Sequence, residues 1–284
     1  MLFRSDTAID TLSKPERPLV IFPEGAVFRT NDILQPLLDG VSFIARTAAK
    51  RRAKDNGGKV VIHPVAIKYL FHGDLKKAIT PTLESLEKRL TWEATKDAPV
   101  LERISKITHA MLSLKEIEYL GSPQSGTFVE RQERLVDHLL DPLEVEWLGK
   151  DADGPIIPRV KSLRMKIVPE LTTGELNETE RERRWRQLSR IYLAQQVASY
   201  PPDYFVAPTT DTRILETVER LEEDLTDRAG VHGPMEVVIR VDEAIEVPAD
   251  RPPKGEEDPV MKTLRERLQK MLDELAQLSN PIED

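Results

Sequence analysis

The sequence contains no cysteine among its 284 residues. Disulfide bonds, thiolate nucleophiles and metal sites built on thiolates are therefore excluded. The absence of cysteine fits a reducing compartment, and we expect the protein to be cytoplasmic. The histidines and carboxylates do not follow ligand spacings such as His-Glu-x-x-His, so we expect no metal site and no bound cofactor.

Long apolar runs are also missing, and none approaches the ~18 residues of a membrane span. Residues 1–20 lack the apolar core of a signal peptide, because Arg4, Asp6 and Asp10 interrupt every apolar run. We therefore expect any contact with the cytoplasmic membrane to be peripheral.

Basic charge is not in excess, since 41 Lys and Arg residues stand against 49 Asp and Glu residues, for a net charge of −8. Binding to nucleic-acid phosphates needs an excess of basic side chains, so we expect no nucleic-acid partner. Charged residues make up 32% and hydrophobic residues 39% of the chain, which suits one large or two smaller globular domains.

The stretch around which the chain is organised is Leu19-Val20-Ile21-Phe22-Pro23-Glu24-Gly25. Residues 19–22 form an apolar run that predicts a buried strand, which Pro23 ends because proline cannot donate to a sheet ladder. Gly25 permits a tight turn. Glu24 is therefore predicted to lie at the carboxyl end of a strand, where ligands bind in open α/β sheets. A surface turn without function is the alternative.

The pattern along the chain predicts an α/β fold interrupted by a large all-helical insertion. Helices are expected within residues 5–17 and 37–48, and residues 59–70 read as a strand covered on both faces. Residues 235–241 predict another strand, and 260–275 a closing amphipathic helix. Residues 1–72 and 235–284 are thus expected to form one discontinuous α/β domain, with 73–234 as the helical insertion.

Within the insertion, helices are predicted at 75–90, 100–119, 128–140, 178–200 and 212–228. Residues 167–169 are interpreted as a short strand or an extended crossing. We find no repeat of fixed period in the sequence pattern.

Phe22-Pro23-Glu24-Gly25 resembles the third sequence block of the glycerolipid acyltransferases of the 1-acylglycerol-3-phosphate acyltransferase type, which usually reads Phe-Pro-Glu-Gly-Thr-Arg-Ser. In this chain three residues, 26–28, separate Gly25 from the arginine, Arg29. Leu2-Phe3-Arg4 is similar to the end of the second block, and the strand with Pro64 at residues 62–67 is similar to the fourth. The resemblance covers somewhat under half of the chain.

This resemblance implies transfer of a fatty acyl group from acyl-CoA or acyl carrier protein to the hydroxyl of a lysophospholipid or glycerol phosphate. It implies a catalytic role for Glu24, which would accept a hydrogen bond from the acceptor hydroxyl or hold an arginine. Arg4 and Arg29 are the expected phosphate contacts, because a guanidinium fork matches phosphate oxygens. The substrate-binding set is completed by the other block residues: Phe22, Pro23, Gly25 and Pro64.

The family's His-x-x-x-x-Asp pair is missing, because none of the five histidines has an aspartate five positions later. The chain is then either a shortened enzyme or one that has lost the chemistry. His72, His63 and His138 are the candidates for a substitute base, although each is more often a structural or solvated histidine. The alternative from another class is a non-catalytic interaction protein that binds through its helices.

Overall fold

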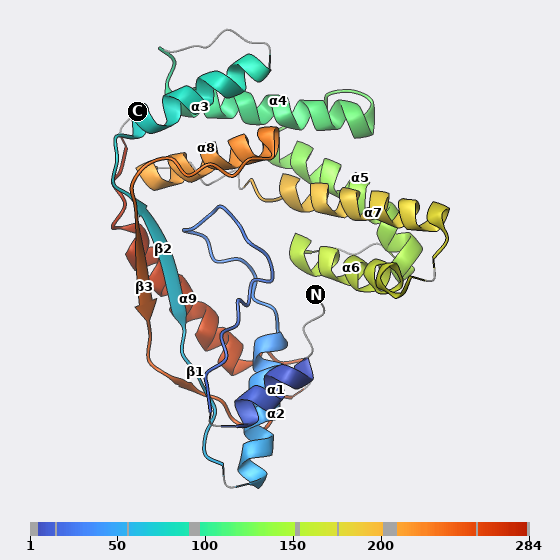
Figure 1. Ribbon diagram of the computed structural model, residues 1–284, viewed down its shortest axis with the longest axis vertical. Coiled ribbons are helices and arrows are strands. Elements are labelled where there is room, and N and C mark those ends of the chain that lie inside the picture. Colours follow the sequence, from blue (N-terminus) through green and yellow to red (C-terminus); the bar gives the residue numbers. More distant parts are fainter. Residues whose placement is uncertain are drawn as a thin grey trace. The chain divides into compact units, whose positions relative to one another are not determined.

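The structure is a computed structural model that describes residues 5–14, 16–55, 57–90, 97–150, 154–174, 176–200, 209–253 and 255–282. Contacts divide the chain into two compact units (Figure 1). We call the first the sheet unit; it comprises Met1–Val27, Asn31–His72 and Pro234–Asn280. The second, the helical unit, comprises Phe28–Thr30, Gly73–Gly233 and Pro281–Asp284.

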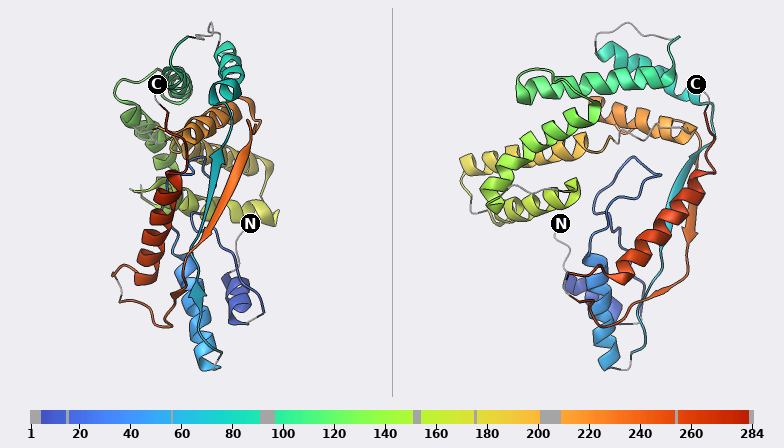
Figure 2. Two further views of the ribbon diagram at one scale, coloured as in Figure 1. Left: turned by 90° about the vertical axis from the view of Figure 1, so that its left-hand side faces the viewer. Right: turned by 180° about the vertical axis from the view of Figure 1, so that it is seen from behind.

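The sheet unit contains three helices and four short strands in its described part. They are α1 (Ser5–Ser13), α2 (Gly40–Lys54), β1 (Val61–Ile62), β2 (Val65–Phe71), β3 (Met235–Val241), β4 (Ile245–Glu246) and α9 (Pro259–Ala276). β1 pairs with β4, and β2 pairs with β3, both antiparallel. α9 packs along β2 (Figure 2), where Ala66 contacts a buried cluster of α9 side chains: Met271, Leu272 and Leu275.

The sheets are the main departure from the predicted fold. Helices and strands are mixed, but the described chain is mostly helical and its strands form two small antiparallel sheets. The strand predicted at residues 19–22 is wrong: this segment pairs with no other described strand, and the side chains of Val20 and Phe22 are exposed. An apolar run indicates strand tendency, but a strand also needs a neighbour to pair with, which a local pattern does not reveal.

The segment 59–70 was predicted to be covered on both faces, and this is also wrong. In β2, buried and exposed residues alternate, so only the face with Ala66, Lys68 and Leu70 is covered. The opposite face carries Val65, Ile67 and other apolar side chains that remain exposed. The apolar content of the strand reflects its β-branched residues rather than burial on two sides.

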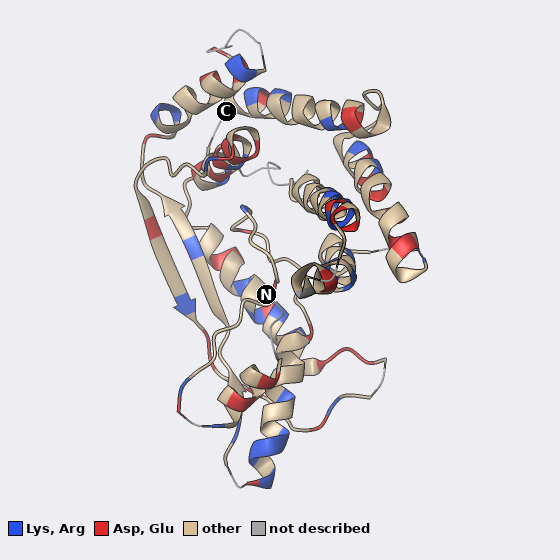
Figure 3. Ribbon diagram, turned by 45° about the vertical axis from the view of Figure 1, so that its right-hand side comes forward, with Lys and Arg blue, Asp and Glu red and all other residues tan. Residues whose placement is uncertain are grey.

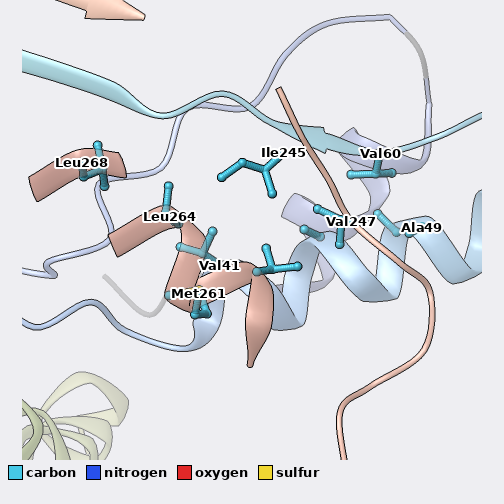
Figure 4. Close-up of a cluster of buried hydrophobic side chains, with 11 residues drawn as sticks. Val41, Ala49, Val60, Ile245, Val247, Met261, Leu264 and Leu268 are labelled. Carbon is cyan, nitrogen blue, oxygen red and sulfur yellow. The ribbon is translucent and has the colours of Figure 1, made fainter. Parts of the chain in front are cut away.

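The core of the sheet unit lies between α2, α9 and the segment around β4 (Figure 4). Aliphatic side chains from these elements form one buried cluster, which includes Val41, Ala45, Ile245, Val247 and Leu264. Beside it, the buried Arg46 binds both carboxylate oxygens of Asp258, at 2.6 and 3.0 Å. Asp258 also caps α9 by accepting from the Val260 amide, so one carboxylate starts the helix and ties it to α2.

The helical unit contains six helices in its described part. They are α3 (Leu75–Arg89), α4 (Val100–Leu120), α5 (Phe128–Leu148), α6 (Ile156–Thr173), α7 (Glu178–Val197) and α8 (Asp211–Thr226). α6 was not predicted, and the interpretation of residues 167–169 as extended is wrong, since Ile167 is fully buried within α6. In the described residues, no helix has both the length and the apolar character needed to cross a membrane.

Buried arginine–glutamate pairs join successive helices of this unit, along which basic and acidic residues alternate with uncharged ones (Figure 3). In each pair, the arginine is the fourth residue of its helix, and the glutamate belongs to the helix before it. Nε binds Oε1 and Nη2 binds Oε2, with all distances between 2.7 and 3.1 Å. We call these pairs the clamps: Arg103 with Glu87, Arg131 with Glu116, and Arg159 with Glu144.

The clamps belong to an internal repeat that corrects the expectation of no fixed period. Leu101-Glu102-Arg103 recurs as Val129-Glu130-Arg131, 28 positions later. The end of α4, Glu116-Ile117-Glu118-Tyr119-Leu120-Gly121, recurs with the same shift as Glu144-Val145-Glu146-Trp147-Leu148-Gly149 at the end of α5. Gly121 and Gly149 both end their helices in the left-handed conformation that glycine tolerates.

Candidate functional site

The Glu24 turn of the sheet unit is held by two hydrogen bonds from the loop that follows it. The Leu38 amide donates to the Pro23 carbonyl oxygen at 2.9 Å. The Gln35 amide donates to Glu24 Oε1 at 2.8 Å. Gly25 has a φ of 74°, so the turn uses a conformation that favours glycine. Residues 23–38 thus form a loop that closes on itself around the Glu24 carboxylate.

Burial raises the pKa of Glu24 above its usual 4.5, and the hydrogen bond from the Gln35 amide only partly offsets this. Desolvation acts this way because it disfavours the charged form of a carboxylate. A carboxyl group with a raised pKa takes up a proton more readily than an ordinary glutamate. Glu24 is therefore suited to accept a proton or a hydrogen bond from a hydroxyl group.

An open groove of about 700 Å³ lies next to the same loop, and Gln35 belongs to both. One wall is apolar and comes from the loop: Leu34, Pro36 and Leu37. The other comes from α9 and carries Arg265 and Lys270 among acidic and amide side chains. Arg265 pairs with Glu257 at 2.6 Å, and Lys270 lies 3.9 Å from Glu274. The groove thus offers an apolar wall opposite exposed cations.

The turn also carries apolar side chains that face solvent. Val20, Phe22 and Val27 are 73%, 76% and 92% exposed. Exposed apolar residues are common singly, but these three lie within four sequence positions of Glu24. A partly buried carboxylate with exposed apolar side chains nearby in the sequence suits a ligand with both a hydroxyl group and a hydrocarbon chain.

The other predicted binding residues lie in different surroundings. Arg29 is counted with the helical unit, where its guanidinium binds Glu223 at 2.8 Å and Glu219 at 3.1 Å. Pro64 is buried, and its carbonyl oxygen accepts from the Asp242 amide. Arg4 lies outside the described residues. Of the predicted set, Phe22, Pro23 and Gly25 are the residues that accompany Glu24 in the turn.

The three candidate histidines have contacts of their own. His63 Nδ1 lies 3.1 Å from the Asp242 carbonyl oxygen, and His72 Nε2 lies 2.6 Å from Glu236. His138 is an exposed residue of α5. Within the described part of the chain, no hydrogen bond or ion pair links any of the three to Glu24. The titratable group that the turn provides is therefore Glu24, without a bonded histidine among the described residues.

The sequence analysis missed one buried ion pair near the turn. Lys68 of β2 binds Asp32 of the Glu24 loop, and the two side chains are 0% and 1% exposed. The neighbouring Asn31 also binds β2: its side chain accepts a hydrogen bond from the Tyr69 amide and donates one to the Tyr69 carbonyl oxygen. Both contacts anchor the loop to β2. A lysine inside an apolar run was the only sequence signal that could have indicated this pair.

Groups of three or more metal-ligating side chains are not found among the described residues. Comparisons of the chain with family models, with curated proteins and with solved structures found no match. What the protein does must therefore be inferred from its own residues.

Proposed function

We propose that the protein is a glycerolipid acyltransferase-like protein. It would transfer a fatty acyl group from acyl-CoA or acyl carrier protein to the hydroxyl of a lysophosphatidic-acid-type acceptor. The observation that carries this proposal is the half-buried Glu24 carboxyl, with a raised pKa, on a turn whose apolar side chains are exposed. The Phe22-Pro23-Glu24-Gly25 resemblance is independent support.

In the proposed reaction the acceptor oxygen attacks the thioester carbonyl carbon. A C–O bond forms, the C–S bond breaks, and the hydroxyl proton passes to a base, which returns it to the departing thiolate so that the thiol leaves. A general base works best when its pKa lies near the working pH, so the raised pKa of Glu24 favours this role. His72, His63 and His138 remain secondary candidates for the base.

The groove beside Gln35 is proposed to hold the acceptor. Its apolar wall would contact the acyl chain, and Arg265 and Lys270 would bind the phosphate. Both cations would have to exchange glutamate partners, Glu257 and Glu274, for phosphate oxygens. The exposed apolar side chains of the turn would contact the cytoplasmic membrane peripherally.

The experiment is an acyl-transfer assay with radiolabelled acyl-CoA and lysophosphatidic acid. Glu24→Gln keeps an oxygen for the Gln35 amide but removes the titratable group, so we expect activity to fall at least about 100-fold. Glu16→Gln, an exposed position of the same unit, is the control that should retain activity. Equal activity of Glu24→Gln and the wild type would remove Glu24 from the mechanism.

A second candidate function, a non-catalytic interaction protein, is favoured by the helical repeat. Ile117 and Val145 occupy equivalent positions in the two copies, and both are exposed although neither is needed for the clamp. Repeated helices present such side chains as a regular surface for partners. A wild-type chain that neither transfers acyl groups nor binds lysophosphatidic acid at equilibrium would favour this function over acyl transfer.

A further inference from the structure

Within the described part of the chain, no strand pairs with the outer edge of β3. The ladder between β2 and β3 is bracketed by bonds from the Asp242 amide to the Pro64 carbonyl and from the His72 amide to the Pro234 carbonyl. In an antiparallel pair, backbone groups point alternately toward the partner and away from it. The register therefore turns the backbone groups of Val237, Ile239 and Val241 away from β2.

The two edges of this sheet differ in their protection. On β2, the Asn31 side chain binds both outward groups of Tyr69. On β3, no backbone hydrogen bond within the described part of the chain reaches the outward groups, and no proline or lysine lies within Met235–Val241. The side chains of Val237, Ile239 and Val241 are 49%, 63% and 61% exposed. An edge of this length, rich in β-branched residues, is a template for another strand.

The sequence of β3 is complementary to itself. Suppose that two β3 strands pair antiparallel about a twofold axis at Val238. Val237 then lies opposite Ile239 of the second copy, and each such pair exchanges two backbone hydrogen bonds. On the other face, Glu236 lies opposite Arg240 of the second copy, an attractive pair that the symmetry repeats.

Charge selects this register over its neighbour. Moving the axis one residue, to Ile239, would set Glu236 opposite Asp242 of the second copy, and like charges directly opposite one another are destabilising. Glu236 and Arg240 already contact His72 and Glu274, but all four side chains are exposed enough to accept an additional partner. α9 packs against the face of the sheet that carries Ala66 and Val238, whereas the outward backbone groups belong to Val237, Ile239 and Val241.

We propose that β3 is the contact strand of a symmetric dimer of this chain, in which two sheets join edge to edge with the twofold axis at Val238. The contact is isologous and therefore closes at two copies. It extends a two-stranded ribbon, which is marginal alone, into a four-stranded sheet. This proposal does not depend on the proposed function.

Cysteine cross-linking tests the axis, because the wild-type chain has no cysteine to interfere. In the proposed register the two Val238 residues form a non-hydrogen-bonded pair, whose close Cα atoms suit a disulfide. Val238→Cys should give a covalent dimer under mild oxidation. Ile239→Cys, although its position is more exposed, should cross-link more slowly because it opposes Val237. Faster cross-linking at 239 than at 238 would overturn the proposed axis.

Charge reversal tests the register in solution by light scattering coupled to size-exclusion chromatography. Glu236→Arg and Arg240→Glu alone should each weaken the dimer at least about tenfold, since each creates a like-charge pair. The double variant E236R/R240E should restore dimerisation, with circular dichroism as the control for folding. A wild-type chain that stays monomeric at all accessible concentrations, or a double variant that dimerises no better than the single ones, would refute the proposal.

Discussion

At the residue scale, Glu24 differs from an ordinary surface glutamate because burial raises its pKa. It is tied to the Gln35 amide on one side and withdrawn from water on the other, with the loop held to β2 by Lys68 and Asp32. Shifted pKa values of carboxyl groups cluster at functional sites. This combination distinguishes the turn from the many exposed glutamates of the chain.

The raised pKa of Glu24 makes a prediction for stability. The folded state binds the Glu24 proton more tightly than the unfolded chain does, so the ionised carboxylate lowers stability above the raised pKa. Glu24→Gln should therefore be more stable than the wild type at about pH 7, and this advantage should vanish below about pH 4, where both states are protonated. Urea unfolding at both pH values measures it. A glutamine variant that is less stable at neutral pH would show that the carboxylate stabilises the fold.

At the element scale, the helical unit is built by repetition of one joint. Each clamp ties the first turn of a helix to the end region of the helix before it. Burial alone would raise the pKa of Glu116, but hydrogen bonds from Arg131 and the Gln124 amide hold it below its usual 4.5. The stabilisation from this clamp is therefore present above about pH 4.5 and is lost as the pH falls through the lowered value.

Removing one member of a clamp should be costly. Arg131→Met leaves the buried Glu116 carboxylate without its partner, and we expect a loss of about 3 kcal/mol in the free energy of unfolding. Arg186→Met is the matched control, because its ion pair with Glu182 is 70% and 62% exposed and should contribute at most about 0.5 kcal/mol. Denaturant unfolding followed by circular dichroism compares the two. Losses of similar size in the two variants would mean that burial does not determine how much a clamp contributes to the free energy of unfolding.

Secondary structure was predictable wherever local pattern decides it. β3 has the predicted limits, 235–241, and α9 covers the predicted 260–275 with Asp258 and Pro259 at its start. α6 was not predicted because Pro158 and Pro169 suggest breaks in a helix. Pro158 lies in the first turn of α6, where a proline destabilises a helix little. The failures in the sheets concern pairing partners, which lie far away in the chain.

The candidate site shows the same limit. Glu24 and its turn were evident from Pro23 and Gly25, which act locally. The groove was not, since α9 meets residues 34–37 only in the folded chain. The Asp32 side chain that binds Lys68 could not be found for the same reason. Residues that form a site within one loop are thus predictable, and those that join distant segments are not.

At the scale of the whole molecule, the repeat predicts which deletions the chain tolerates. Removing residues 122–149, one period of 28, would join Gly121 to Lys150 and bring Glu116 to the same chain distance from Arg159 that Glu144 has now. We expect this variant to fold cooperatively with one helix fewer, because the clamp spacing is kept. Removing only residues 122–145 changes the chain distance between Glu116 and Arg159. We expect this shorter deletion not to fold cooperatively.

Circular dichroism and thermal unfolding distinguish these two deletions. A cooperative transition for the in-phase deletion, and none for the shorter one, is the expected outcome. If both variants unfold alike, the two copies of the repeat are similar in sequence but do not pack in equivalent ways.

The repeat also has a consequence for how the length of the gene can change in evolution. Two similar stretches in tandem give the coding sequence a place where misaligned recombination can add or remove a block. Arg131 and Arg159 each bind a glutamate 15 positions earlier in the chain. Adding or removing a block of one 28-residue period therefore preserves the spacing of these clamps. We expect relatives of this chain to differ in length here by whole helices, while the turn around Glu24 keeps its length.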